Sequence, residues 1–153
     1  MDIRSTLRVY DQADVPGAPG VTEGQTYQKL IGVAERPTDR VRVGRATYVP
    51  GTYEQLHWHP IEALYYVISG QATVRDVEGT ERLVGPGSIV YAPAGMGGAH
   101  EWEVGESLEL LDIRATNEAS RKMQFTVDRA TLRSHIDVED LVARDGIEFP
   151  SHY

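Results

Sequence analysis

The chain has 153 residues and a formal net charge of −8, with 15 Lys and Arg residues against 23 Asp and Glu residues. This length is sufficient for one domain with a hydrophobic core. The basic residues are scattered along the chain and form no basic cluster of the kind that binds nucleic acid. Because the chain contains no cysteine, disulfides and thiolate metal sites are excluded, and histidine and carboxylate side chains remain as metal ligands.

The first four residues lead into no apolar stretch. We therefore expect neither a signal peptide nor a membrane span, and we expect a soluble cytoplasmic protein. Turn-forming residues are dense up to Gly20, and a moderately apolar stretch follows from Tyr27 to Val33. Residues 1–37 are predicted to form an irregular arm with one or two short strands.

From residue 40 onward, the pattern of side chains is that of β-strands. Residues 41–48 alternate between two faces with a period of two, and Pro50-Gly51 ends this strand. The sequence predicts an antiparallel all-β barrel over residues 38–115 or so. Its further predicted strands and turns are residues 52–59, 64–69, 71–77, 88–92, 100–104 and 108–113, a hairpin turn at Ser69-Gly70, and turns at Glu78-Gly79 and Pro86-Gly87.

Beyond Arg114 the composition becomes charged. Residues 130–143 are predicted to hold a short helix, because the largely acidic segment Asp137-Val138-Glu139-Asp140 leads into Leu141-Val142. We expect residues 116–153 to form a C-terminal tail on the barrel, and residues 1–153 to form a single domain.

Two histidines one residue apart are the most informative feature of the predicted barrel. In an extended strand, residues i and i+2 point to the same face, so His57 and His59 present two imidazoles in one direction. A third ligand brought in by folding would complete a metal site, and His100 stands on the far side of a Pro-Gly turn. His135 lies in the charged tail and His152 beside the C-terminus, so we interpret both as structural.

The spacing of these residues resembles the two motifs of the cupin family. Gly51, five residues, His57-Trp58-His59 and then Gly70 resemble the first motif. Gly87, five residues and Pro93-Ala94-Gly95 resemble the start of the second motif. The resemblance implies that the single domain is a cupin, folded as a double-stranded β-helix, or jelly-roll barrel, with a metal ion in its mouth.

Two departures from the family's motifs affect the ligand set. Ala63 replaces the glutamate that usually follows the second histidine, and the adjacent Glu62 should point outward because side chains alternate along a strand. A one-residue bulge would instead turn Glu62 inward as a fourth ligand. Two extra residues precede His100, and an even-numbered insertion keeps its side chain on the inner face. The resemblance therefore implies a metal site of His57, His59 and His100.

Three neutral imidazoles leave the charge of a divalent metal ion uncompensated and several of its coordination positions open, which favours an anionic bidentate ligand. Imidazole suits iron(II), zinc, copper and nickel, so the residues alone do not choose the metal. Within the cupins, a small chain with three histidines and no motif glutamate resembles the β-diketone-cleaving dioxygenases, and also the thiol dioxygenases.

The first of these resemblances implies a non-haem iron(II) dioxygenase that binds the enolate of a 1,3-dicarbonyl through both oxygens and cleaves a C–C bond with O2. Iron(II) is the expected metal, with zinc and nickel as alternatives. Thiol dioxygenases are less favoured because no charged clamp for an amino acid is evident, although Arg42, Arg45 and Arg75 lie on neighbouring strands. Two other classes stay open: a zinc or nickel cupin acting as a non-oxidative isomerase, lyase or hydrolase, and a non-catalytic small-molecule-binding cupin.

The substrate pocket beside the histidines is predicted to be apolar and aromatic. Its predicted lining is Tyr65, Val67, Met96 and Trp102, although Val67 is better explained as barrel core.

The outer faces of the same strands predict how the protein meets its surroundings. Glu101 and Glu103 should point away from His100, into solvent or a subunit interface. Leu64, Tyr66 and Ile68 would expose an apolar stripe. We therefore expect a homodimer or homotetramer, with a small-molecule substrate and O2 as its other partners and with no nucleic acid or membrane.

Overall fold

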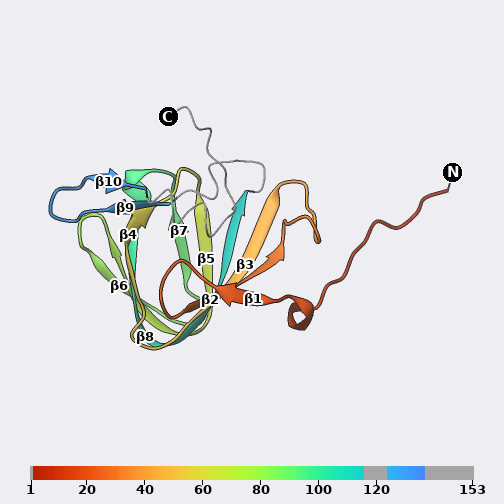
Figure 1. Ribbon diagram of the computed structural model, residues 1–153, viewed down its shortest axis with the longest axis horizontal. Coiled ribbons are helices and arrows are strands. Elements are labelled where there is room, and N and C mark those ends of the chain that lie inside the picture. The colour runs from red at the N-terminus through yellow and green to blue at the C-terminus, as the bar shows by residue number, and fades with distance from the viewer. Residues whose placement is uncertain (1, 116–123, 137–153) are drawn as a thin grey trace.

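The computed structural model describes residues 2–115 and 124–136, and these residues build an antiparallel sheet that curls into a barrel (Figure 1). The all-β jelly-roll expectation is confirmed. Within the described residues, no helix has the length and apolar character needed to cross a membrane. The strands are β1 Gly17–Pro19, β2 Gln25–Ile31, β3 Val41–Tyr48, β4 Tyr53–Trp58, β5 Ala63–Asp76, β6 Glu81–Val84, β7 Ile89–Ala92, β8 His100–Ala115, β9 Phe125–Val127 and β10 Ser134–His135, with 3-10 turns at Gln12–Asp14 and Met96–Gly98.

Strand β8 connects the two sides of the barrel. Its first half pairs with β4, its second half pairs with β3, and β5 pairs with it along most of its length. In Figure 1, β5 and β8 curve together through the base of the barrel, while the start of β3 and the ends of β4 and β7 lie on the opposite side. This arrangement places the start of β8 beside the end of β4.

The core lies between these strands because their side chains alternate between an inner apolar face and an outer face. Ala63, Tyr65 and Val67 of β5 are 1%, 6% and 0% exposed, which confirms the predicted inward face of this strand. Leu108 and Leu110 of β8 are each 1% exposed and pack in the same cluster. The inner face of β5 therefore adjoins the inner face of β8 under the barrel mouth.

The predicted hairpin turn at Ser69-Gly70 is wrong. Strand β5 runs without interruption through both residues, and Gly70 takes a positive φ of 87° inside it. The register against β8 shifts three times between Val67 and Ala72, so the glycine sits in a bulged bend. Likewise, the predicted strands 100–104 and 108–113 are parts of one 16-residue strand.

The two flanks of the barrel differ from the sequence expectation in smaller ways. The predicted arm contains β1 and β2, and β2 extends the sheet by pairing with β3. Strand β6 was not predicted, and it pairs with the second half of β5. The predicted helix at 130–143 is wrong where the structure describes it, because β10 occupies this part of the chain, and residues 137–143 lie outside the described residues.

Glu101 is buried rather than solvated, which corrects the expectation for the outer face of β8. Its side chain is held by Arg75, whose Nη1 lies 3.2 Å from Oε1, and by the hydroxyl of Tyr53, which donates to Oε2 over 2.6 Å. Glu103 is exposed, as expected, and pairs with the same arginine over 2.9 Å. The ion pair with Arg75 compensates the charge of the buried carboxylate.

The outer face of β5 is apolar, as its sequence predicts. Tyr66 and Ile68 are 42% and 39% exposed, and Ile89 and Tyr91 of the neighbouring β7 are 64% and 56% exposed. Contiguous exposed apolar side chains of this kind often mark a protein interface. The expected homo-oligomer stays a prediction.

Replacing Gly70 with alanine is expected to destabilise the barrel more than replacing Gly51. Both glycines have a positive φ, but a Cβ at Gly70 would meet the carbonyl oxygen of Ser107, whereas one at Gly51 would have nothing within 4 Å. We expect a loss of unfolding free energy of about 1 kcal/mol for Gly51→Ala and at least about 3 kcal/mol for Gly70→Ala. Urea unfolding measures both; equal losses would show that the bend in β5 tolerates a side chain.

Candidate metal centre

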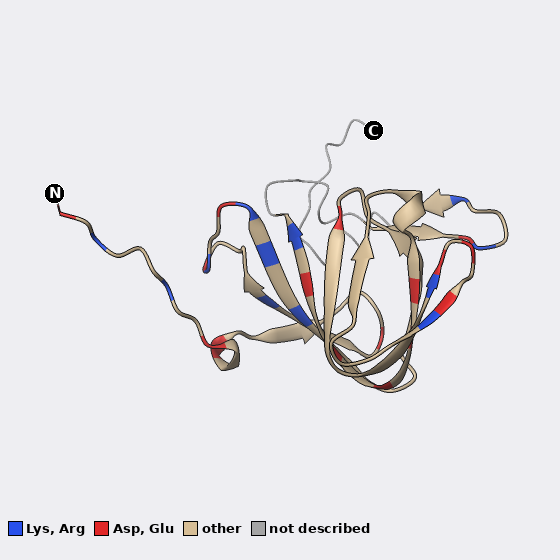
Figure 2. Ribbon diagram, turned by 180° about the vertical axis from the view of Figure 1, so that it is seen from behind, with Lys and Arg blue, Asp and Glu red and all other residues tan. Residues whose placement is uncertain are grey.

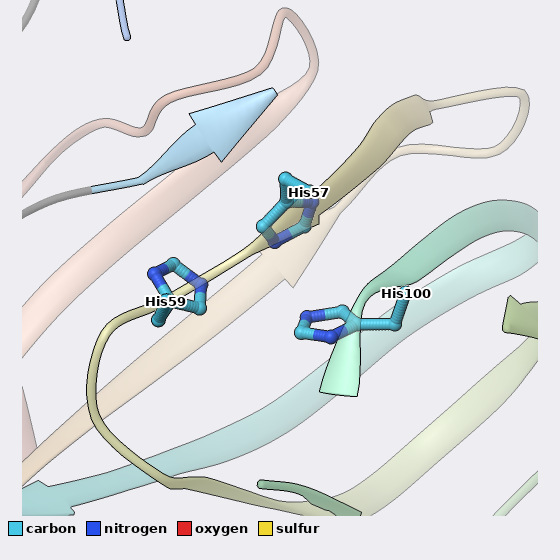
Figure 3. Close-up of side chains that lie close together, drawn as sticks. All are labelled: His57, His59 and His100. Atoms are coloured by element: carbon cyan, nitrogen blue, oxygen red, sulfur yellow. The ribbon is translucent and has the colours of Figure 1, made fainter. Parts of the chain in front are cut away.

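Three histidines converge at the mouth of the barrel (Figure 3). His57 lies near the end of β4, His59 follows this strand, and His100 begins β8 directly opposite His57. One ring nitrogen from each of the three lies within 4.8 Å of the others, and all three residues are buried. Strand pairing thus brings together the two parts of the sequence that were predicted to share a metal ion.

Backbone carbonyls orient two of the three imidazoles. Nδ1 of His57 lies 2.7 Å from the carbonyl oxygen of Gln55, and Nδ1 of His100 lies 2.9 Å from that of Gly98. A carbonyl oxygen only accepts hydrogen bonds, so Nδ1 carries the proton in each ring and Nε2 keeps a lone pair. Such contacts are the usual means by which proteins fix a histidine for metal binding through its other nitrogen.

The same two rings are neutral at physiological pH. Desolvation by burial is the main reason that the pKa of His57 falls to about 4 and that of His100 to about 3. The lone pairs on Nε2 are therefore available without the release of a proton. Neutral imidazole suits a divalent first-row transition metal, so the donor set fits the metal ion that the motifs imply.

A buried carboxylate stands beside this cluster. Glu54 is 9% exposed, and its Oε1 lies 3.2 Å from Nε2 of His57. Burial is the main cause that raises the pKa of Glu54, so a proton on this carboxyl group can be donated to the lone pair on Nε2 of His57. Two ligands at about 2.1 Å from one ion, at 90° to 110° from each other, are about 3.0 to 3.4 Å apart, which matches this distance. Among the described residues, however, the group whose ligand atoms all lie within 4.8 Å of one another is His57, His59 and His100, so Glu54 is a neighbour of the cluster that contacts His57.

A β-bulge explains why Glu54 faces His57. In a regular strand, residues three apart point to opposite faces. Between Glu54 and His57, however, β4 has one residue more than the paired segment of β8 from His100 to Trp102, and the register shifts there. The extra residue brings the two side chains to the same face. Sequence alternation alone gives no sign of this bulge, so Glu54 was not predicted.

Glu62, which was considered as a fourth ligand, lies on the outside of the barrel. It is exposed, and the hydroxyl of Tyr91 donates to its Oε2 over 2.7 Å. The adjacent Ala63 pairs with Ala92 in a register that stays regular through Tyr66. Without a bulge at this point, the side chain of Glu62 remains on the outer face.

A cavity of about 490 Å³ adjoins the cluster, and His59, His100 and Glu54 form part of its wall. Tyr65 and Trp102, two predicted pocket residues, also line it. Val67 lies instead in the core beneath, and the partly buried Met96 packs against a separate small cluster of Leu56, Ala99 and Val127.

Tyr65 places a hydroxyl group at the cluster. Its oxygen lies 3.3 Å from Nε2 of His100. Burial is the main cause that raises the pKa of Tyr65 well above its usual value. The hydroxyl therefore keeps its proton at physiological pH and can donate it to a hydrogen-bond acceptor in the cavity.

Arg114 is a second functional candidate that the sequence reasoning missed. Its Nη1 and Nη2 lie 3.2 and 3.4 Å from the ring nitrogens of His59, and its Nη2 donates to the hydroxyl of Tyr65 over 3.1 Å. Asp112 holds the same guanidinium through Nε over 2.8 Å. The predicted strand ended at residue 113. Continuing the alternation of the inner-face residue Leu110 would have placed Asp112 and Arg114 on the inner face as well.

The three arginines that were considered as clamps have different surroundings. Arg42 lines the cavity. Arg45 pairs with Glu109 over 2.7 Å, and Arg75 pairs with Glu81 over 2.7 Å. His135, interpreted as structural, is exposed in β10, and His152 lies outside the described residues.

Comparison with known proteins agrees with the fold. Residues 44–114 match the family model described as a cupin domain, and no curated protein matches the chain. Similar solved structures include the polyketide cyclase RemF from Streptomyces resistomycificus, at 21% identity and a TM-score of 0.64, covering 74% of this chain and 82% of that one. KdgF from a Halomonas species has 18% identity and a TM-score of 0.62, covering 74% and 97%. The cupin-2 domain protein Rru_A2000 from Rhodospirillum rubrum has 16% identity and a TM-score of 0.60, covering 95% and 91%.

Glu54→Gln is expected to weaken zinc binding, because it removes the charge of the carboxylate nearest to the three imidazoles. We expect a loss of affinity of about 10-fold to 100-fold. The matched control is Glu62→Gln, which removes the same charge from the outer face and should leave the affinity unchanged. Competition with a chromophoric chelator measures both; an equal effect of the two changes would show that Glu54 does not support the bound ion.

Proposed function

We propose that this chain, whose match over residues 44–114 and jelly-roll fold support the cupin family, is a metal-dependent enzyme. The observation that carries the proposal is the convergence of three buried histidines, two of them neutral and oriented with Nε2 available. His57, His59 and His100 would hold the ion, with Glu54 beside them. Iron(II) is the proposed metal, and zinc and nickel suit the same nitrogen donors.

The proposed substrate is a small bidentate anion, such as the enolate of a β-diketone. Two features of this chain support it. The cavity of about 490 Å³ has room for a small molecule beside the histidines. The protonated hydroxyl of Tyr65 is placed to donate to a substrate oxygen, and the buried Trp102 adds an apolar surface to the same cavity wall.

The proposed reaction is a dioxygenase reaction that cleaves a C–C bond of this substrate with O2. When bound, iron(II) would favour the enolate and supply the redox chemistry with O2. The residues of the chain would orient the substrate, keep water out and donate a hydrogen bond from Tyr65. This proposal follows the resemblance to the three-histidine β-diketone dioxygenases.

Glu54 favours a second candidate, a zinc or nickel enzyme that acts without O2 as an isomerase, lyase or hydrolase. A buried carboxylate beside the cluster can accept a proton from a substrate carbon or from water, and zinc lowers the pKa of bound water toward neutrality. A donor hydroxyl and an acceptor carboxylate at one cluster also favour catalysis over binding alone.

Oxygen uptake separates the two reactions. Protein loaded anaerobically with iron(II) is expected to consume O2 when it is given a 1,3-diketone, with one C–C bond cleaved for each O2 consumed. His57→Ala, His59→Ala and His100→Ala should each lose bound metal and activity, because each removes a nitrogen donor from the cluster. His135→Ala, which changes an exposed histidine, is the control and should retain both.

The readouts are an oxygen electrode, metal analysis and product identification. If iron-loaded protein consumes no O2 with any diketone or thiol, the dioxygenase proposal is wrong. Turnover by zinc-loaded protein without O2 would then identify the non-oxidative reaction.

A further inference from the structure

We infer that Arg114 binds a carboxylate group of the substrate, so that the substrate is a 1,3-dicarbonyl carrying a carboxylate, of the class of 2,4-dioxo acids. This inference rests on the proposed function, in which the two carbonyl oxygens of the substrate would bind the metal ion. The inference identifies the group of the substrate that Arg114, rather than the metal ion, would bind.

Arg114 is rigidly placed at the wall of the cavity. Its side chain is 9% exposed, and the carboxylate of Asp112, 8% exposed, fixes it through Nε over 2.8 Å. Both residues belong to β8, two positions apart on its inner face. A guanidinium that is held in this way loses little conformational entropy when it binds a ligand.

The guanidinium has hydrogen-bond donors to spare. Arginine carries five N–H groups. Within the described parts of the chain, Asp112 accepts from Nε, the hydroxyl of Tyr65 accepts from Nη2, and the one lone-pair nitrogen of a neutral His59 ring accepts from the guanidinium only where it does not bind a metal ion. These contacts use at most three N–H groups, so at least two can serve a ligand in the cavity that Arg114 lines.

The positive charge at the site also favours an anionic ligand. A divalent ion at the three histidines would stand close to Arg114, because the guanidinium contacts the ring of His59 itself. Asp112 and Glu54 offset only part of this positive charge. An anion that bridges the ion and the guanidinium would relieve the repulsion between them.

The basic side of the barrel extends this positive region in a chain whose net charge is −8. Lys29, Arg36 and Arg42 also line the cavity, against one further acidic residue, Glu35. Figure 2 shows basic residues gathered on the adjacent strands β2 and β3 and at the end of β8. A local excess of positive charge at a pocket attracts anionic ligands.

The geometry selects a carboxylate close to the chelating oxygens. Arginine and carboxylate match as a fork with two parallel hydrogen bonds. Because Arg114 touches both His59 and Tyr65, the acceptor must lie next to the metal-bound end of the substrate. A carboxylate attached directly to one of the two carbonyl carbons, as in a 2,4-dioxo acid, meets this requirement.

The test compares 2,4-dioxopentanoate with its methyl ester, which retains both carbonyl groups but lacks the negative charge of the carboxylate. Binding to zinc-loaded protein is measured by calorimetry without O2, so that no turnover is required. We expect the wild-type protein to bind the acid at least about 10-fold more tightly than the ester. Arg114→Gln should abolish this preference by weakening the acid alone, while metal analysis shows an unchanged zinc content.

Lys29→Gln is the matched control, because Lys29 lines the same cavity but belongs to β2, which carries none of the three histidines; it should retain most of the preference for the acid. Equal affinity of the wild-type protein for acid and ester would overturn the inference, and this result needs no variant. Equal weakening of both ligands by Arg114→Gln would also overturn it. If zinc-loaded wild-type protein binds neither ligand, the proposed chelating function itself fails.

Discussion

The histidine cluster depends on the antiparallel pairing of the end of β4 with the start of β8. This pairing sets His57 opposite His100 and buries both rings, and the burial keeps them neutral. Backbone carbonyls two residues before each ring then turn its free nitrogen toward the shared space. The long strands β5 and β8 supply the rigid base on which this arrangement rests, since their inner faces form the apolar core.

Groups of opposite charge surround the three imidazoles. Glu54 approaches from β4 and Arg114 from the far end of β8, while Tyr65 of β5 contacts both Arg114 and His100. Three different strands therefore place an acceptor, a cation and a hydroxyl donor around one cluster. Such a set can compensate the charge of an anionic ligand, orient it and donate hydrogen bonds to it, in addition to any contact that a bound metal ion would make.

The sequence was sufficient to predict features that follow from periodicity and motif spacing: the all-β barrel, the inward face of Tyr65 and Val67, and the approach of His100 to the histidine pair. It was not sufficient where the backbone departs from regular alternation. The bulge before His57 and the bend at Gly70 change the register without an unambiguous residue signal. The role of Arg114 was not predicted, because a charged residue at the end of a predicted strand is usually exposed to solvent. Its burial depends on the ion pair with Asp112, which only the structure shows.

X-ray absorption spectroscopy of the zinc-loaded protein tests the central claim, that three imidazoles of this chain bind one metal ion. We predict three imidazole nitrogens at about 2.0 to 2.1 Å from zinc, with the outer-shell scattering that identifies the rings. The same measurement on His100→Ala should show one imidazole fewer or no specifically bound zinc. A wild-type spectrum with fewer than three imidazoles would contradict this prediction, because at least one histidine of the cluster would then not bind the metal.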